Sequence, residues 1–101
     1  MVAIEKQGKC NKLLIGVDVT ASTAGTLWNV FLANLDDCEE MEINLSQVNM
    51  VDTEGLRWVR KAMIEASRNG KSLRFVSGRP ETPEVLSLYR IFCEFVEPAA
   101  R

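Results

Sequence analysis

The chain has 101 residues, of which 47% are hydrophobic, and its formal net charge at pH 7 is -2. This length suits one domain with a hydrophobic core, so we expect residues 1–101 to form a single domain. The mild acidity argues against a protein whose main task is to bind nucleic acid.

The chain contains no histidine, and its cysteines, Cys10, Cys38 and Cys93, are not arranged as C-x-x-C. Ser–His and Cys–His nucleophile pairs are therefore excluded, and a zinc cage would need all three thiols plus a carboxylate. Phosphate-binding glycine motifs are absent from the sequence as well. These features favour a protein that is not an enzyme and uses no metal or cofactor. The thiols fit a reducing compartment, with at least one of them buried.

The N-terminal region is polar and is not followed by a long apolar core, so it does not predict a secretory signal. The apolar stretch 13–19 is interrupted by Asp18 and is too short to span a bilayer. We therefore expect a cytoplasmic protein that is not embedded in a membrane.

The first half of the chain predicts strands on either side of a helix. Apolar and polar residues alternate over 13–19, which is typical of a half-buried strand, and 2–7 is a weaker candidate. Apolar residues at helical spacing then predict a helix over about 22–35, capped by Thr20, Ser22 or Thr23. Alternation over 40–45 predicts the next strand.

The second half begins with a change to helical periodicity. The residues expected to form the buried stripe of this helix are Leu56, Val59, Met63 and Ala66. Asn69-Gly70 predicts its end, since glycine commonly terminates helices. A strand at 73–76, a turn at 78–80 and an amphipathic helix from Thr82 to Phe92 follow. The order predicts an α/β fold: a mixed sheet of about four strands with helices packed mainly on one face.

The segment 43–56 joins a hydrophobic strand and a short turn to Asp52-Thr53-Glu54-Gly55-Leu56 at a helix start. This pattern resembles the signature of STAS domains, the anti-sigma-factor antagonists and their relatives. The resemblance extends over about 13–96 and implies a STAS-like fold and a regulatory, protein-binding role.

The resemblance assigns the central position to Thr53, because phospho-regulated STAS domains are phosphorylated on the Ser or Thr after the Asp. A helix start suits a phosphate, which adds a charge of about -1.5 to -2. Asp52 and Glu54 would oppose that charge, and Glu54 replaces the small residue common in phospho-regulated members. The alternative is that Asp52 or Thr53 only caps the helix, and both interpretations stay open.

Four neighbours complete the expected phosphorylation and partner-binding surface: Asp52, Glu54, Gly55 and Arg57, with Trp58 as a further candidate. Gly55 either permits a close approach at the first turn or is merely tolerated. Trp58 is either packed under neighbouring chain or exposed as an anchor for a partner. Arg57, Arg60 and Lys61 form either a solvated face or one that attracts an acidic partner or a phosphate.

Two kinds of protein partner follow from these resemblances. The anti-sigma-antagonist type implies docking to an anti-sigma factor or serine/threonine kinase. A narrower resemblance, in 25–28, 51–56 and 88–91, is to the cytoplasmic STAS subunit of bacterial phospholipid-trafficking ABC transporters. It implies that Thr53 contacts the ATPase of such a transporter.

Overall fold

The computed structural model describes residues 1–76, which form one sheet and two helices. In chain order the elements are β1 (Val2–Gln7), β2 (Cys10–Ile15), α1 (Ala24–Ala33), β3 (Glu40–Asn44), α2 (Thr53–Arg68) and β4 (Ser72–Val76). The turn expected at 78–80, the helix expected from Thr82 and the thiol of Cys93 lie outside the described residues.

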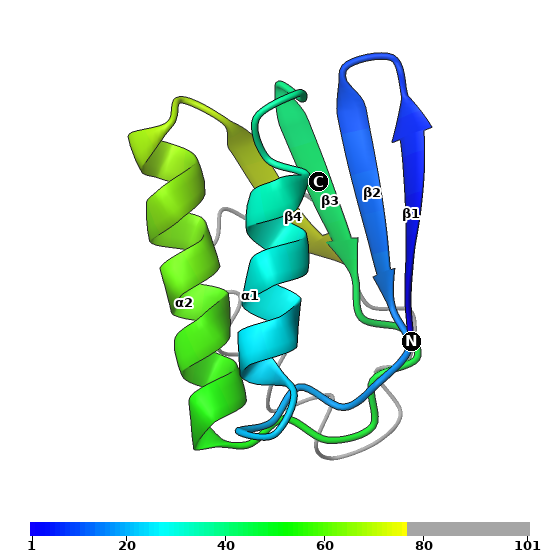
Figure 1. The fold of residues 1–101 in the computed structure, drawn as a ribbon, viewed down its shortest axis with the longest axis vertical. Coiled ribbons are helices and arrows are strands. Elements are labelled where there is room, and N and C mark those ends of the chain that lie inside the picture. Colours follow the sequence, from blue (N-terminus) through cyan, green and yellow to red (C-terminus); the bar gives the residue numbers. More distant parts are fainter. Residues whose placement is uncertain (77–101) are drawn as a thin grey trace.

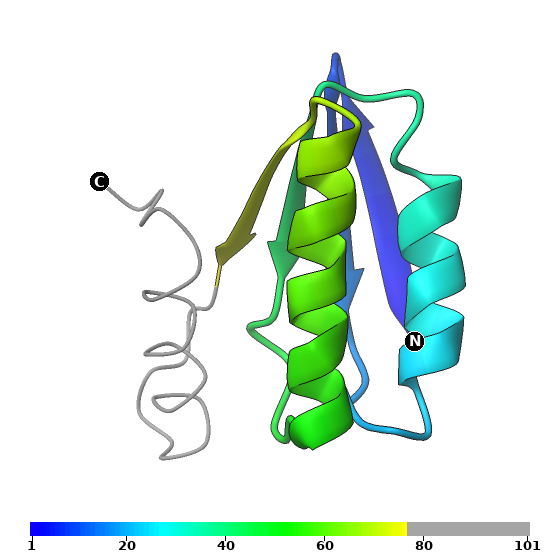
Figure 2. The same ribbon diagram turned by 90° about the vertical axis from the view of Figure 1, so that its left-hand side faces the viewer.

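The sheet has the order β1-β2-β3-β4, with β1 antiparallel to β2 and the other neighbours parallel (Figure 1). Parallel neighbours need a crossover between them, and α1 and α2 provide the two crossovers. Both helices cover the same face of the sheet, as the side view shows (Figure 2). The predicted mixed four-stranded sheet with helices on one face is confirmed.

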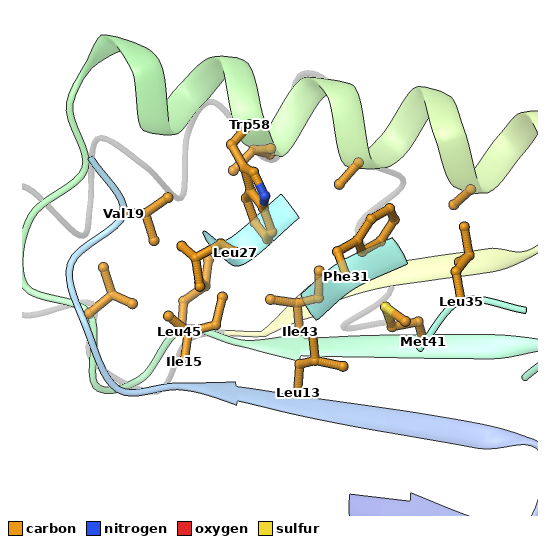
Figure 3. Close-up of a cluster of buried hydrophobic side chains, with 14 of the residues drawn as sticks. Leu13, Ile15, Val19, Leu27, Phe31, Leu35, Met41, Ile43, Leu45 and Trp58 are labelled. Atoms are coloured by element: carbon orange, nitrogen blue, oxygen red, sulfur yellow. The ribbon is translucent and has the colours of Figure 1, made fainter. Parts of the chain in front are cut away.

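The core lies between this face of the sheet and the helices (Figure 3). Alternate residues of β2 are buried, which is the period of two expected when only one face of a strand meets the core. The largest fully buried side chains are Phe31, Leu13, Ile15, Leu27, Leu35, Met41, Ile43, Leu45, Val19, Val48 and Asn11. Among the cysteines, Cys38 is buried, and its burial raises the pKa of the thiol.

The buried stripe of α2 is rotated from the predicted one. Its buried residues are Gly55, Trp58, Val59, Ala62 and Ala66, whereas Leu56 and Met63 are only partly buried. The rotation arises because α1 packs beside α2 and brings Phe31 against the Trp58 ring.

The predicted strand 13–19 ends earlier, at Ile15. The N–H of Gly16 donates to the Met1 carbonyl (2.7 Å), and the chain then leaves the ladder, with Val19 forming an isolated parallel bridge to Val51. The first helix is also shorter than the expected 22–35, because residues 20–23 form a hydrogen-bonded turn before Ala24.

The two ends of the sheet differ in what they contain. At the lower end of Figure 1, residues 16–23 and 45–52 lead from strands into helices. At the upper end, 8–9 form the turn between β1 and β2, whereas 34–39 and 69–71 lead from helices into strands. α2 ends at Arg68, followed by Asn69 and Gly70 (φ 68°), as predicted. None of the helices in 1–76 is long and apolar enough to cross a membrane.

Candidate functional site

The lower end is built where two loops cross, each following a parallel strand. The N–H of Val19 donates to the Met50 carbonyl (3.0 Å), and the N–H of Asp52 donates to the Val19 carbonyl (3.3 Å). Since carboxyl ends of neighbouring parallel strands share one sheet edge, the starts of α1 and α2 are held side by side. This edge carries the sequence motif.

Asp52 ties the start of α2 to the first loop. One carboxylate oxygen accepts from the Gly55 N–H (2.8 Å) and caps the helix, while the other accepts from the Ala21 N–H (3.1 Å). The Gly55 N–H, followed by the Ala21 N–H, lowers the pKa of the Asp52 carboxyl. Asp52 is therefore the helix cap, and its charge is committed to fixing the backbone beneath Thr53.

Asp18 holds the second loop in the same manner. One oxygen of its carboxylate accepts from the N–H groups of Asn49 (3.0 Å) and Met50 (3.1 Å). No role at this site is predicted for Asp18 from the sequence. The available signal was a charged residue inside an otherwise apolar alternation, just before the first helix.

Gly55 explains how closely the helix approaches the loop. A Cβ atom at this position would lie 2.0 Å from the Val19 carbonyl oxygen, a distance that no side chain tolerates without a backbone shift. The glycine is thus required by the crossing of α2 over Val19, and the close approach expected from the sequence is to this chain's own backbone.

Thr53 is the first residue of α2 and is exposed, as is Glu54 beside it. One turn later, Nη1 of Arg57 lies 3.0 Å from Oε2 of Glu54, with side chains that are 70% and 48% exposed. We call Thr53, Glu54 and Arg57 the docking face. Three of the expected surface residues are thus brought together in solvent, while Asp52 and Gly55 support them from below.

Trp58 is only 2% exposed and packs edge-on against Phe31, with ring centroids 6.2 Å apart. Of the two alternatives for Trp58, the structure therefore shows the packed one. Its Nε1 is buried and has no hydrogen-bond partner among the described residues. Phe31 also stacks with Trp28. The centroid of the Trp28 ring lies 4.5 Å from the Lys61 ammonium nitrogen.

A hollow of about 370 Å³ separates α1 and α2 next to the docking face. We call it the interhelix groove, and its lining includes Gly25, Trp28, Glu54, Arg57, Trp58 and Lys61. The sequence could not reveal this groove, because its two walls are brought together by tertiary packing. Within residues 1–76, no cluster of three or more metal-ligating side chains is present.

Comparison with known proteins identifies the family to which the chain belongs. The family model described as "Mlab, STAS domain" matches residues 2–92. The chain belongs to the STAS domain family. Its relatives of the anti-sigma-antagonist type are regulatory domains without enzymatic activity, in agreement with the expectation from the sequence. A search of curated proteins gave no match.

Solved structures share the fold at low sequence identity. An anti-sigma factor antagonist from Mycobacterium paratuberculosis superposes with a TM-score of 0.77 at 18% identity, covering 95% of this chain and 82% of that one. The Bacillus cell fate determinant SpoIIAA, in its phosphorylated form, gives 0.68 at 11% identity and covers 95% and 84%. Mglu superposes with a TM-score of 0.67 at 17% identity. The match covers 81% of this chain but only 19% of the longer Mglu chain.

Proposed function

We propose that this STAS domain, spanning residues 1–101, is a cytoplasmic regulatory module that docks an anti-sigma factor or serine/threonine kinase through the docking face. The observation that carries the proposal is the position of Thr53. It is exposed at the first residue of α2, on a backbone that Asp52 holds through both of its carboxylate oxygens. A partner can cover this residue without any rearrangement of the fold.

Phosphorylation of Thr53 would change this face by charge alone. The modification adds about -1.5 to -2 charges beside the carboxylates of Asp52 and Glu54. Arg57 is the cation nearest in sequence, and it already pairs with Glu54. The modified face would therefore be strongly negative and would repel a partner that had docked to the neutral threonine, which makes Thr53 suitable as a switch.

A second candidate function is that of an accessory subunit binding the ATPase of a lipid-trafficking ABC transporter. One observation favours it: segments 25–28 and 51–56, which carry the narrower resemblance, lie at the same surface. Trp28 from the first segment lines the groove beside Glu54 from the second. The two candidates share the docking face and differ in the partner.

The test is affinity purification of the tagged protein from its own cells, comparing the unchanged chain with Thr53→Glu. A matched control is Thr26→Glu, which places the same charge on an exposed threonine of α1 that lines a different hollow. We expect a kinase or anti-sigma factor to be captured by the unchanged chain and by Thr26→Glu, and to be lost from Thr53→Glu.

Capture of an ABC ATPase with the same dependence on Thr53 would favour the second function. Equal recovery of every partner by Thr53→Glu would refute the docking face itself. Mass spectrometry of the purified chain, before and after incubation with a captured kinase and ATP, tests the modification of Thr53 directly.

A further inference from the structure

The interhelix groove has an apolar floor made of fixed aromatic rings. Trp28 stacks on Phe31 with centroids 5.4 Å apart and an angle of 27° between the planes, and Trp58 meets Phe31 edge-on at 74°. Rings held in this way lose little conformational freedom when a partner covers them, which is why buried aromatic residues dominate binding energetics. The floor suits an apolar side chain.

The rim of the groove is positive. Lys61 contributes an ammonium group above the Trp28 ring, and Arg57 contributes a guanidinium group that offsets the charge of Glu54. Glu54 is the one carboxylate among the described lining residues, so the rim carries a net positive charge. Such a rim complements an acidic ligand and disfavours a basic one.

The start of α1 adds to this positive character. No acidic residue occupies its first turn, and the side chain of its N-cap residue, Thr23, makes no capping hydrogen bond to the helix. The N–H of Ala24 donates to the Thr20 carbonyl (2.8 Å), and the positive end of the α1 dipole lies at the end of the groove formed by Ala24 and Gly25. A Cβ atom at Gly25 would meet nothing within 4 Å, so this end is open to a ligand.

A further observation concerns the indole N–H of Trp58, a residue that also lines the groove. This donor is buried and lacks an acceptor among residues 1–76, which is unusual because buried donors are nearly always satisfied. A ligand oxygen would reach it only after the Trp58 ring had turned, because the nitrogen is buried. The positive rim is therefore the feature of the groove that favours a ligand rich in carboxylate oxygens.

We propose that the interhelix groove binds an acidic segment of the partner protein, with an apolar side chain on the tryptophans and carboxylates at Lys61 and Arg57. The proposal rests on the proposed function, since the same partner would cover Thr53. It also says what phosphorylation of Thr53 would act on, because a phosphate there would lie beside the acidic segment and repel it.

Intrinsic fluorescence tests the proposal directly, because Trp28 and Trp58 are the two tryptophans of the chain and both line the groove. The probe is a short synthetic peptide in which aspartate and glutamate alternate with leucine. The comparison peptide carries lysine at every acidic position. We expect the acidic peptide alone to change the emission, with an affinity that falls as salt is added.

Lys61→Glu should weaken binding of the acidic peptide roughly fivefold or more, given the size of exposed charge interactions. The matched control is Lys9→Glu, which reverses an exposed lysine that pairs with Glu39 at the upper end. It should leave the affinity unchanged. Thermal unfolding of both variants, followed by circular dichroism, verifies that they remain folded.

Equal binding of the basic peptide would overturn the proposal, and so would an identical emission change with inorganic phosphate alone. Affinity purification with Lys61→Glu separates this proposal from the previous one. A partner lost from Thr53→Glu but fully retained by Lys61→Glu would refute the acidic-segment site and leave the docking face standing.

Discussion

The lower and upper ends of the sheet both use an aspartate as an acceptor, but for different purposes. At the lower end, Asp18 and Asp52 accept hydrogen bonds from backbone N–H groups of the opposite loop. At the upper end, Asp37 accepts from the side chains of Lys6 and Asn11. The lower end therefore has a fixed backbone beneath an exposed surface, whereas the upper end is closed by its own side chains.

Asn11 is the centre of the upper end and is only 1% exposed. Its side-chain amide donates to the Asn34 carbonyl (2.8 Å) and to Asp37 (2.9 Å), which joins β2 to the end of α1. Nearby, the Lys71 ammonium donates to the carbonyls of Asp36 (3.1 Å) and Cys38 (2.7 Å). We therefore expect changes at the upper end to affect stability alone, and changes at the lower end to affect the proposed partner binding as well.

The largest effect is expected at the lower end, from Gly55→Ala. The added methyl group must displace backbone at Val19, so we expect the free energy of unfolding to fall by about 3 kcal/mol. Gly25→Ala is the control, because it adds the same atom to a helix where nothing lies within 4 Å. Urea denaturation of both variants measures the difference, and equal stability of the two would contradict the close crossing.

A smaller loss is expected at the upper end, from Asn11→Ala. This change removes two hydrogen bonds from a buried position and leaves the Asn34 carbonyl with only the weak Cys38 thiol as a donor, which costs about 2 kcal/mol. Gln7→Ala, on the exposed edge strand, should change stability by less than about 0.5 kcal/mol.

The Asn11→Ala variant should still capture the same partners as the unchanged chain at a temperature where it is folded. Loss of a partner from a folded Asn11→Ala variant would show that the two ends are not independent. That result would remove the distinction between a structural end and a binding end.

Much of the fold could be predicted because its signals are local. The cap at Asp52, the stop at Gly70 and the strand alternation each depend on a few adjacent residues. Asn11 shows a signal that was present and not used: extending the alternation of Leu13 and Ile15 back by two residues places Asn11 on the buried face. The weak strand at 2–7 was confirmed as β1.

The contacts of the candidate site could not be predicted, because they join residues far apart in sequence. Asp18 binds N–H groups 31 and 32 positions away, and Asp52 binds one 31 positions away. The position of Trp58 depends in the same way on α1, since only the packed helix decides which side of α2 is covered. Sequence periodicity gives the width of a buried stripe more reliably than its direction.

The smallest expected effect is on the stability of the fold at low pH. The physical cause of this effect differs between the two ends. The pKa is lowered in the native state for both Asp52 and Asp37. A lowered native pKa stabilises the fold above the ordinary value near 3.8, and this contribution is lost as the pH falls through the native pKa. Asp52→Asn and Asp37→Asn should each make acid unfolding below about pH 4 less steep.

Added salt should change the pKa values of these two carboxyl groups by different amounts. The main cause at Asp37 is the charged side chain of Lys6, and this pair is exposed, so added salt should raise the pKa of Asp37 toward its ordinary value. The main cause at Asp52 is the neutral N–H of Gly55, which salt screens far less. Titration of the carboxyl carbons by NMR at low and high salt measures both groups in one sample. If the pKa of Asp52 moved with salt as much as that of Asp37, the lower end would be held by charge pairs, and the contrast between a backbone-fixed docking end and a charge-paired closed end would be wrong.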